Sequence, residues 1–338
     1  MSRRVLVARL DNIGDVLLAG PAVRAVAARA DSVCMLAGPR GAAGARLLPG
    51  VDEVVEWCAP WIDPEPGPVS AAEVGGLVER IRGFGPAEAL VFTSYHQSPL
   101  PLALLLRLAG VPRIAAISED YPGSLLDVRH RVDGDPPEPE RALSLAAAAG
   151  FPLPRGDDGR LRVAGPLPDV STVVGERGYV VVHPGASVPA RQWPTFRCSA
   201  VVRALAAAGR RVVVTGAATE RELTARVAGT AGLDLGGRTD LPELAAVLAG
   251  ADAVIAPNTG PAHLAAAVGT PVVSLFAPVV RAARWAPYGV PRVVLGDQRA
   301  PCADTRARVC PVPGHPCLTR VTAADVVAAV ERVQEVAA

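Results

Sequence analysis

The chain has 338 residues, half of them apolar, and a net charge of only +1. This length is typical of two domains of ~100–200 residues, each with its own buried core. The longest dense apolar stretch, Leu100–Leu106, is far shorter than the ~20 residues of a membrane-spanning helix. We find no signal-peptide pattern and therefore expect a cytoplasmic chain without a transmembrane segment.

In chain order, the first half opens with a buried strand at 4–10, a turn at 11–15 and helical spacing at 16–30. Further strands are predicted at 32–37, 53–57, 89–93 and 114–117, and further helices at 71–82, 100–109 and 141–150. Strands that alternate with helices predict a parallel sheet with helices on both faces. We interpret 133–140 as an acidic, proline-rich loop and 151–170, with its four prolines and three glycines, as the interdomain linker.

The same pattern restarts in the second half. Strands are predicted at 179–182, 211–215, 253–256 and 272–276, and helices at 195–208, 220–228, 241–248 and 261–268. The fold class is therefore α/β with two Rossmann-like domains, which leave a cleft between the carboxyl ends of both sheets. A last helix, 322–336, begins with the capping-box pattern Thr322-x-x-Asp325.

The charge distribution and the cysteine spacing restrict the kinds of ligand that we expect the chain to bind. Residues 1–165 contain 17 Arg and 20 acidic residues, a net charge of −3, whereas residues 166–338 contain 17 Arg and 13 acidic residues, a net charge of +4. That excess suits an anionic small ligand, and we expect no nucleic-acid partner because a concentrated basic face is missing. Cys302, Cys310, His315 and Cys317 lie within 16 residues but match no standard zinc spacing, so we expect no metal site.

The first candidate for chemistry is Asp15, in Ile13-Gly14-Asp15 directly after the first strand. Open α/β sheets bind ligands at this edge, where Asp15 could serve as a general base. It could equally cap the following helix. The other glycines of a dinucleotide-binding fingerprint are missing, which argues against an oxidoreductase.

Three strand–turn–helix junctions follow in the second half. His183-Pro184-Gly185-Ala186-Ser187 offers backbone N–H groups and the Ser187 hydroxyl to a phosphate, with Arg191 close behind, although it could be an ordinary turn. Asn258-Thr259-Gly260-Pro261-Ala262-His263 opens a helix whose N-terminus can bind an anion, although His263 could be structural. Glu220 could accept hydrogen bonds from ribose hydroxyls or only complement a helix dipole. Together these junctions predict one nucleotide site at one sheet edge.

These residues resemble the ADP-heptose:lipopolysaccharide heptosyltransferase family, glycosyltransferase family 9. The matching stretches include RLDNIGDVLLAGPAVRAV, VVVHPGASVPARQWP, VVVTGAATERE and the long run GRTDLPELAAVLAGADAVIAPNTGPAHLAAAVGTPVVSLFAP. The resemblance implies the GT-B architecture: an acceptor-binding domain at 1–165, a nucleotide-sugar-binding domain at 166–321 and a C-terminal helix, 322–338, that crosses toward the first domain.

The resemblance further implies an inverting, metal-independent transfer from an ADP-sugar, with no cofactor. Asp15 is similar to the proposed base, Ser187 and Arg191 to diphosphate contacts, and Glu220 to a ribose contact. Thr239 matches an adenine contact, and Thr259, Gly260 and His263 match the helix-terminus diphosphate site. Asn258, which precedes them, is a further candidate donor contact. Many members have Lys in place of Arg191 and Asp in place of Asn258, which leaves the identity of the sugar open.

The acceptor is expected to bind the first half. Its charge of −3, with Glu119 and Asp120 as candidate contacts, favours a neutral or cationic acceptor such as an aminocyclitol from antibiotic biosynthesis. The alternative acceptor is a lipopolysaccharide core or another cell-envelope glycan. A second alternative is a nucleotide-sugar-binding protein that has lost its activity.

Overall fold

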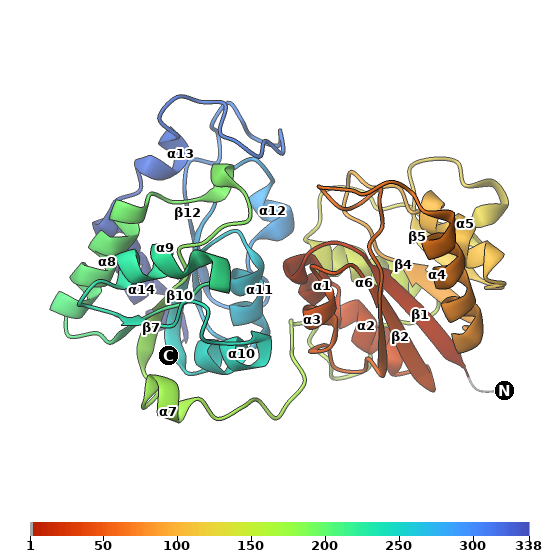
Figure 1. Cartoon of the computed structure of the whole chain (residues 1–338), viewed down its shortest axis with the longest axis horizontal. Coiled ribbons are helices and arrows are strands. Elements are labelled where there is room, and N and C mark those ends of the chain that lie inside the picture. The colour runs from red at the N-terminus through yellow and green to blue at the C-terminus, as the bar shows by residue number, and fades with distance from the viewer. Residues whose placement is uncertain (1–2, 338) are drawn as a thin grey trace. The chain divides into compact units, whose positions relative to one another are not determined.

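The computed structural model describes residues 3–337. The chain forms two compact units, residues 1–164 and 165–338, and each unit has its own parallel sheet. The chain runs from red to blue in Figure 1, so the first unit is drawn in red to yellow and the second in green to blue.

The first unit alternates strands and helices from its first strand to its last helix. Its elements are β1 (Arg4–Arg9), α1 (Ile13–Leu18), α2 (Gly20–Ala27), β2 (Ser32–Ala37), α3 (Ala42–Ala45), β3 (Glu53–Glu56), α4 (Ala71–Phe84), β4 (Glu88–Val91), α5 (Leu100–Leu108), β5 (Ile114–Ile117), η1 (Gly123–Leu125), β6 (Val128–His130) and α6 (Glu138–Ala148).

The sheet of the first unit has the strand order β3-β2-β1-β4-β5-β6, with all neighbours parallel. Side chains alternate across β1, and both faces are buried. Leu6 and Ala8 pack with α4 and α5 in one apolar core. Helices α1, α2 and α6 contact one another and form a separate layer (Figure 1). The predicted doubly wound sheet is therefore confirmed in this unit.

The second unit repeats this plan with additional short helices. Its elements are α7 (Ser171–Val174), β7 (Tyr179–Val182), η2 (Pro189–Arg191), α8 (Thr195–Ala207), β8 (Val212–Val214), η3 (Ala218–Glu220), α9 (Arg221–Ala228), β9 (Leu233–Asp234), α10 (Leu241–Ala249), β10 (Ala251–Pro257), α11 (Gly260–Ala267), β11 (Val272–Leu275), α12 (Ala282–Trp285), β12 (Arg292–Leu295), α13 (Pro316–Thr319) and α14 (Ala323–Ala337).

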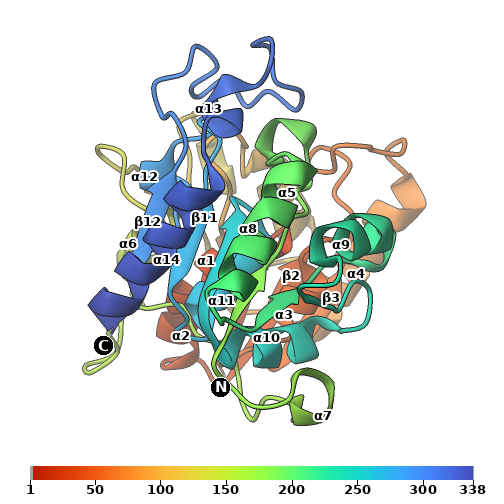
Figure 2. The ribbon, with the colours of Figure 1, turned by 90° about the vertical axis from the view of Figure 1, so that its left-hand side faces the viewer.

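The second sheet has the order β12-β11-β10-β7-β8-β9, which is the same topology as the first. Helices α8 and α14 lie side by side over this sheet (Figure 2). The buried face of α14, with Val326 and Val330, belongs to the core of the second unit. The expected crossing of 322–338 toward the first domain concerns the placement of the units and stays a prediction.

The start of α14 confirms the predicted capping box. The backbone N–H of Asp325 donates to Oγ1 of Thr322 at 3.2 Å, and the N–H of Thr322 donates to Oδ2 of Asp325 at 2.8 Å. These two bonds satisfy donors that the first helical turn would otherwise leave free.

Two loop predictions were wrong in their extent. Residues 133–140 were expected to be a loop, yet α6 begins at Glu138, because proline and acidic residues are both favourable in a first helical turn. The expected linker at 151–170 is also shorter, since its first part packs on the first unit. Phe151 is fully buried, and Arg24 pairs with Asp157 at 2.8 Å.

Candidate active site

Each sheet reverses its strand order beside its first strand. In the first unit this switch lies between β1 and β4, and Ala8 pairs with Val91 near the carboxyl ends of both strands. In the second unit it lies between β7 and β10, where Val182 pairs with Ile255. Open α/β sheets bind ligands outside the carboxyl ends of their strands at such a switch. Both switches carry clusters of polar side chains.

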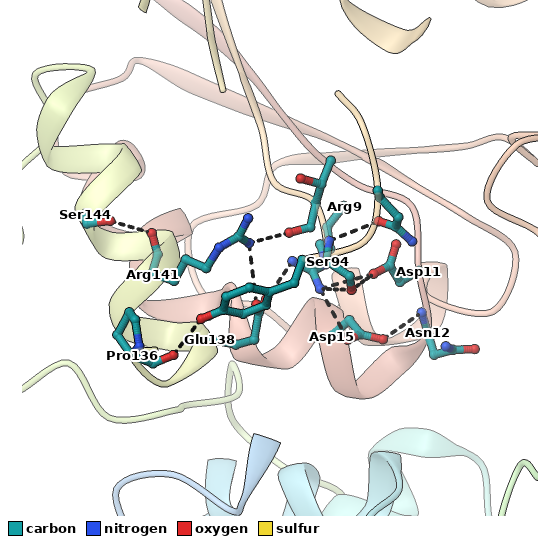
Figure 3. A network of polar contacts seen from close by, with 12 residues as sticks. Arg9, Asp11, Asn12, Asp15, Ser94, Pro136, Glu138, Arg141 and Ser144 are labelled. Atoms are coloured by element: carbon teal, nitrogen blue, oxygen red, sulfur yellow. Dashed lines mark hydrogen bonds and ion pairs between the residues drawn. The ribbon is translucent and has the colours of Figure 1, made fainter. Parts of the chain in front are cut away.

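The cluster of the first unit is centred on Arg9, the last residue of β1, whose side chain is only 2% exposed. Its Nη2 lies 3.1 Å from Oδ2 of Asp11 and 3.2 Å from Oδ1 of Asp15. Its Nη1 donates to Oε2 of Glu138 at 3.0 Å. Figure 3 shows the three carboxylates around this one guanidinium. Burial alone would lower the pKa of Arg9, but the three carboxylates raise it above its usual range.

Ser94, in the loop after β4, connects the two strands of the switch. Its hydroxyl accepts a hydrogen bond from Nη2 of Arg9 at 2.9 Å and donates one to Oδ2 of Asp11 at 2.6 Å. The Asp11 side chain is 6% exposed. Asp11 is therefore enclosed by its partners, which makes it a poor candidate for contact with a substrate.

Asp15 is the more accessible carboxylate, with 18% of its side chain exposed. It is the third residue of α1, and Asn12 is the N-cap. The alternative that Asp15 caps this helix is confirmed in part, because its side chain accepts a hydrogen bond from the backbone N–H of Asn12 in a capping box. Oδ1 of Asp15 accepts a hydrogen bond from Arg9 at 3.2 Å, whereas Oδ2 accepts, among residues 3–337, only a long bond of 3.4 Å from the backbone N–H of Asn12. Oδ2 is thus the oxygen that can accept a proton from a ligand.

Helix α6 contributes a second cation, Arg141, to the network. Nη1 of Arg141 donates to the carbonyl of Thr93 and lies 3.4 Å from Oε1 of Glu138. Its guanidinium also covers the ring of Tyr95, 4.4 Å from the centroid. Figure 3 shows Arg141 on α6 beside Glu138. Burial raises the pKa of Glu138, and Arg9 and Arg141 oppose that shift.

Four residues of this network were not predicted from the sequence: Arg9, Ser94, Glu138 and Arg141. Arg9 offered one usable signal, a charged residue at the end of an otherwise apolar strand. Glu138 offered no such signal, because residues 133–140 were predicted to form a loop. The expected acceptor contacts, Glu119 and Asp120, are exposed residues after β5, one strand beyond β4.

The cluster of the second unit gathers around the start of α11. Nη1 of Arg191 lies 3.4 Å from the backbone carbonyl of Asn258, at the end of β10. Both polar atoms of the Asn258 side chain and Nδ1 of His263 are buried without a hydrogen-bond partner among residues 3–337. Burial, together with the nearby Arg191, lowers the pKa of His263 to about 4, so the ring is neutral. Buried polar groups normally have partners, so these atoms point to a ligand.

The other residues of this helix start have simpler surroundings. Thr259 is the N-cap of α11, but its hydroxyl donates back to the carbonyl of Pro257 at 3.4 Å instead of capping the helix. Gly260 is the first helical residue. The backbone N–H groups of this first turn can therefore bind an anion.

Glu220 lies against the loop that follows β7. A Cβ atom at Gly185 would be 1.9 Å from Oε1 of Glu220, so only glycine permits this approach. Oε2 accepts a hydrogen bond from the N–H of Ala217 at 2.8 Å, which shows that Glu220 also caps its own turn. His183 pairs with Thr215 at 3.1 Å, and burial lowers its pKa although Glu220 acts in the opposite direction.

Two predicted donor contacts lie on loops. Ser187 is exposed between β7 and η2, and Thr239 is half-buried between β9 and the Asp240 N-cap of α10. Thr239 follows β9, two strands away from β7, so it is separated from the switch by β8.

Neither a metal cluster nor a membrane span is found in the described part of the chain. Within residues 3–337, no three His, Cys, Asp or Glu side chains are grouped so that they could hold a metal ion. All six cysteines are free thiols. No helix between residues 3 and 337 combines the length and apolar character needed to cross a bilayer.

Two Rossmann-like units with polar clusters at their switch points define a GT-B type α/β protein. A family model described as Glycosyltransferase family 9 (heptosyltransferase) matches residues 97–315, and the chain belongs to this family. Lipopolysaccharide heptosyltransferase 3 of Escherichia coli is 33% identical over 165 residues, 46% of this chain and 47% of that protein. The chain thus matches about half the length of such curated relatives.

Solved structures share the fold along the whole chain. E. coli ADP-heptose lps heptosyltransferase II has a TM-score of 0.76 at 20% identity, with 99% of each chain covered. The E. coli heptosyltransferase WaaC with ADP-2-deoxy-2-fluoro heptose has a TM-score of 0.72 at 22% identity, with 97% of this chain and 99% of that chain covered.

Proposed function

We propose that the protein is an inverting glycosyltransferase that moves a heptose, or a related sugar, from an ADP-sugar to an acceptor hydroxyl. One observation carries the donor assignment: among the described residues, no hydrogen-bond partner is found for either buried polar atom of the Asn258 side chain or for the buried Nδ1 of His263, which lie near Arg191 at the start of α11. Family membership and the similarity to heptosyltransferases, one of them named as an ADP-heptose enzyme, support the same class of donor.

In this proposal the second unit binds the donor. The guanidinium of Arg191, the Ser187 hydroxyl and the first turn of α11, with Thr259 and Gly260, contact the diphosphate. Asn258 and neutral His263 complete their hydrogen bonds with the diphosphate or the sugar. Glu220 accepts hydrogen bonds from the ribose, and Thr239 contacts the adenine. These groups stabilise the charge that develops on departing ADP, so the transfer requires no metal or cofactor.

Asp15 of the first unit acts as the general base. Its Oδ2 accepts the proton of the acceptor hydroxyl while the acceptor oxygen forms a bond to the anomeric carbon. The bond from that carbon to the phosphate oxygen breaks in the same displacement, and the electron pair leaves with ADP. The configuration at the anomeric carbon inverts because one displacement occurs without a covalent enzyme intermediate. General-base catalysis of this kind contributes ~10²–10⁴-fold.

For the acceptor we propose a small neutral or cationic molecule, such as an aminocyclitol intermediate of antibiotic biosynthesis. Exposed Glu119 and Asp120, and the net charge of −3 on residues 1–165, support a cationic acceptor over a phosphorylated one. The competing acceptor is a lipopolysaccharide core or other envelope glycan. Similarity to lipopolysaccharide heptosyltransferase 3 of E. coli supports that alternative about equally well.

The test is ADP release from ADP-heptose by the purified protein with two panels of acceptors, aminocyclitols and phosphorylated lipid cores. We expect release with a member of the first panel. Release only with a lipid core would contradict the acceptor proposal and retain the donor proposal. Binding of ADP-heptose without release for any acceptor would instead favour an inactive nucleotide-sugar-binding protein.

A further inference from the structure

The network around Arg9 contains more charged groups than a single general base needs. Arg9 is fully buried and contacts Asp11, Asp15 and Glu138 within 3.2 Å. Glu138 lies 129 residues away in the chain and is 2% exposed. The proposed reaction assigns no role to Arg9 or Glu138.

The charges that face this network come from four segments. Strand β1 contributes Arg9, the following loop and α1 contribute Asp11 and Asp15, and α6 contributes Glu138 and Arg141. Ser94 and Tyr95, after β4, are uncharged partners. Beyond Arg141, the His130 ring on β6 pairs with Ser144, and burial, followed by Arg141, lowers the pKa of His130, which favours its neutral form. Two cations therefore face three carboxylates.

Because the carboxylates outnumber the cations, Asp15 receives only part of the electrostatic stabilisation that Arg9 can provide. Arg9 directs Nη1 to Glu138 and shares Nη2 among Ser94, Asp11 and Asp15. A fully paired carboxylate is a weak base, whereas one that shares its cation stays more basic. The pKa of Glu138 is itself raised by burial first and, among the smaller causes, by Asp15, so the two carboxylates interact.

We propose that Arg9 and Glu138 are positioning residues for Asp15. Arg9 fixes the orientation of Oδ1, which leaves Oδ2 for the acceptor, and Glu138 occupies part of Arg9's charge so that Asp15 keeps its strength as a base. This inference rests on the proposed function and adds to it the origin of the basicity of Asp15.

The test compares three variants by their pH–rate profiles. In Glu138→Gln, Arg9 no longer pairs with a carboxylate on α6 and stabilises the ionised forms of Asp11 and Asp15 more strongly. The acid limb of the pH profile of kcat should therefore shift to lower pH by about one unit. The plateau of kcat should fall about tenfold, with KM for ADP-heptose within twofold of wild type. Glu138→Asp restores the charge and should return the acid limb toward wild type. Asp157→Asn, which breaks the Arg24 pair in the same unit, should leave the limb unmoved.

A second variant tests the orientation of Asp15 by Arg9. Should Glu138→Gln fail to fold, Arg9→Lys keeps the charge but loses the planar fork, and kcat should then fall more than tenfold with donor KM unchanged.

The outcomes separate the two proposals. An active wild type whose acid limb is unchanged in Glu138→Gln would overturn this inference and leave the proposed function standing. A wild type that releases no ADP with any acceptor would overturn the proposed function and, with it, this inference.

Discussion

At the scale of single residues, His263 shows how the candidate donor site affects stability. The fold holds the pKa of this histidine at about 4, against 6.5 in the unfolded chain, chiefly because burial disfavours the charged ring. The folded pKa is lowered, so the stability from neutral His263 is complete above pH 6.5 and is lost as pH falls toward 4. That contribution is about 3 kcal/mol at most.

We therefore expect the free energy of unfolding to fall between pH 6.5 and 4 in the wild type, and to fall less steeply in His263→Gln. Urea unfolding at several pH values measures both curves. His183 contributes in the same direction in both proteins, because burial lowers its pKa too, so the difference between the curves isolates His263. Parallel curves would contradict the burial of a neutral ring.

Gly185 is a second residue whose role follows from geometry. A Cβ atom there would meet Oε1 of Glu220 at 1.9 Å and would push the carboxylate away from its place beside the β7 loop. Gly185→Ala should therefore weaken ADP binding about tenfold, or ~1.4 kcal/mol, as measured by calorimetry.

A matched control is Gly76→Ala, on α4 of the first unit, where an added Cβ has open space. This change should leave ADP affinity unaltered and stabilise the protein by up to ~1 kcal/mol, since alanine is the better helix former. Equal ADP affinity in Gly185→Ala and Gly76→Ala would remove Glu220 from the donor site.

At the scale of elements, helix starts decide where several functional side chains lie. The sequence predicts α14 with its capping box, because Thr322 and Asp325 have the pattern that the structure uses. Thr322→Ala should lower the free energy of unfolding by about 1 kcal/mol. The control is the exposed Thr230→Ala, expected to change stability by less than ~0.5 kcal/mol. Equal losses in a thermal denaturation series would show that the cap is unimportant.

Short edge strands and exact helix starts are the elements that the sequence does not predict. Periodicity locates long, apolar elements such as β1 and α5, but β6 has three half-buried residues and β9 has only two residues. Such edge strands are defined by pairing with a neighbour that local sequence does not reveal. The predicted start of helix α6, residue 141, was three residues too late, and this error left Glu138 outside the predicted helix.

The candidate site also contains some residues that local sequence predicts and others that it does not. Asp15 and the residues that open α11 are predictable because each stands in a strand–turn–helix junction with a local pattern. The network of Arg9 is not, since its contacts join positions up to 129 residues apart. Burial and charge sharing arise only when β1, β4 and α6 meet.

At the scale of the whole molecule, the two units have separate sheets and separate apolar cores. We expect residues 165–338, produced alone, to fold cooperatively and to bind ADP within about an order of magnitude of the full chain's affinity, given cores of typical domain size. Residues 1–164 alone should not bind ADP. Circular dichroism and calorimetry measure folding and binding, and an ADP site that requires residues 1–164 would contradict the division of roles.

The central claim is that Asp15 is the base for sugar transfer from an ADP-linked donor. The most direct measurement is the rate of ADP release from ADP-heptose with an active acceptor, for wild type, Asp15→Asn and Asp157→Asn. We predict that Asp15→Asn is slower by ~10²–10⁴-fold with unchanged ADP affinity, while Asp157→Asn retains wild-type rates. An Asp15→Asn protein that releases ADP within a few-fold of the wild-type rate would contradict the account.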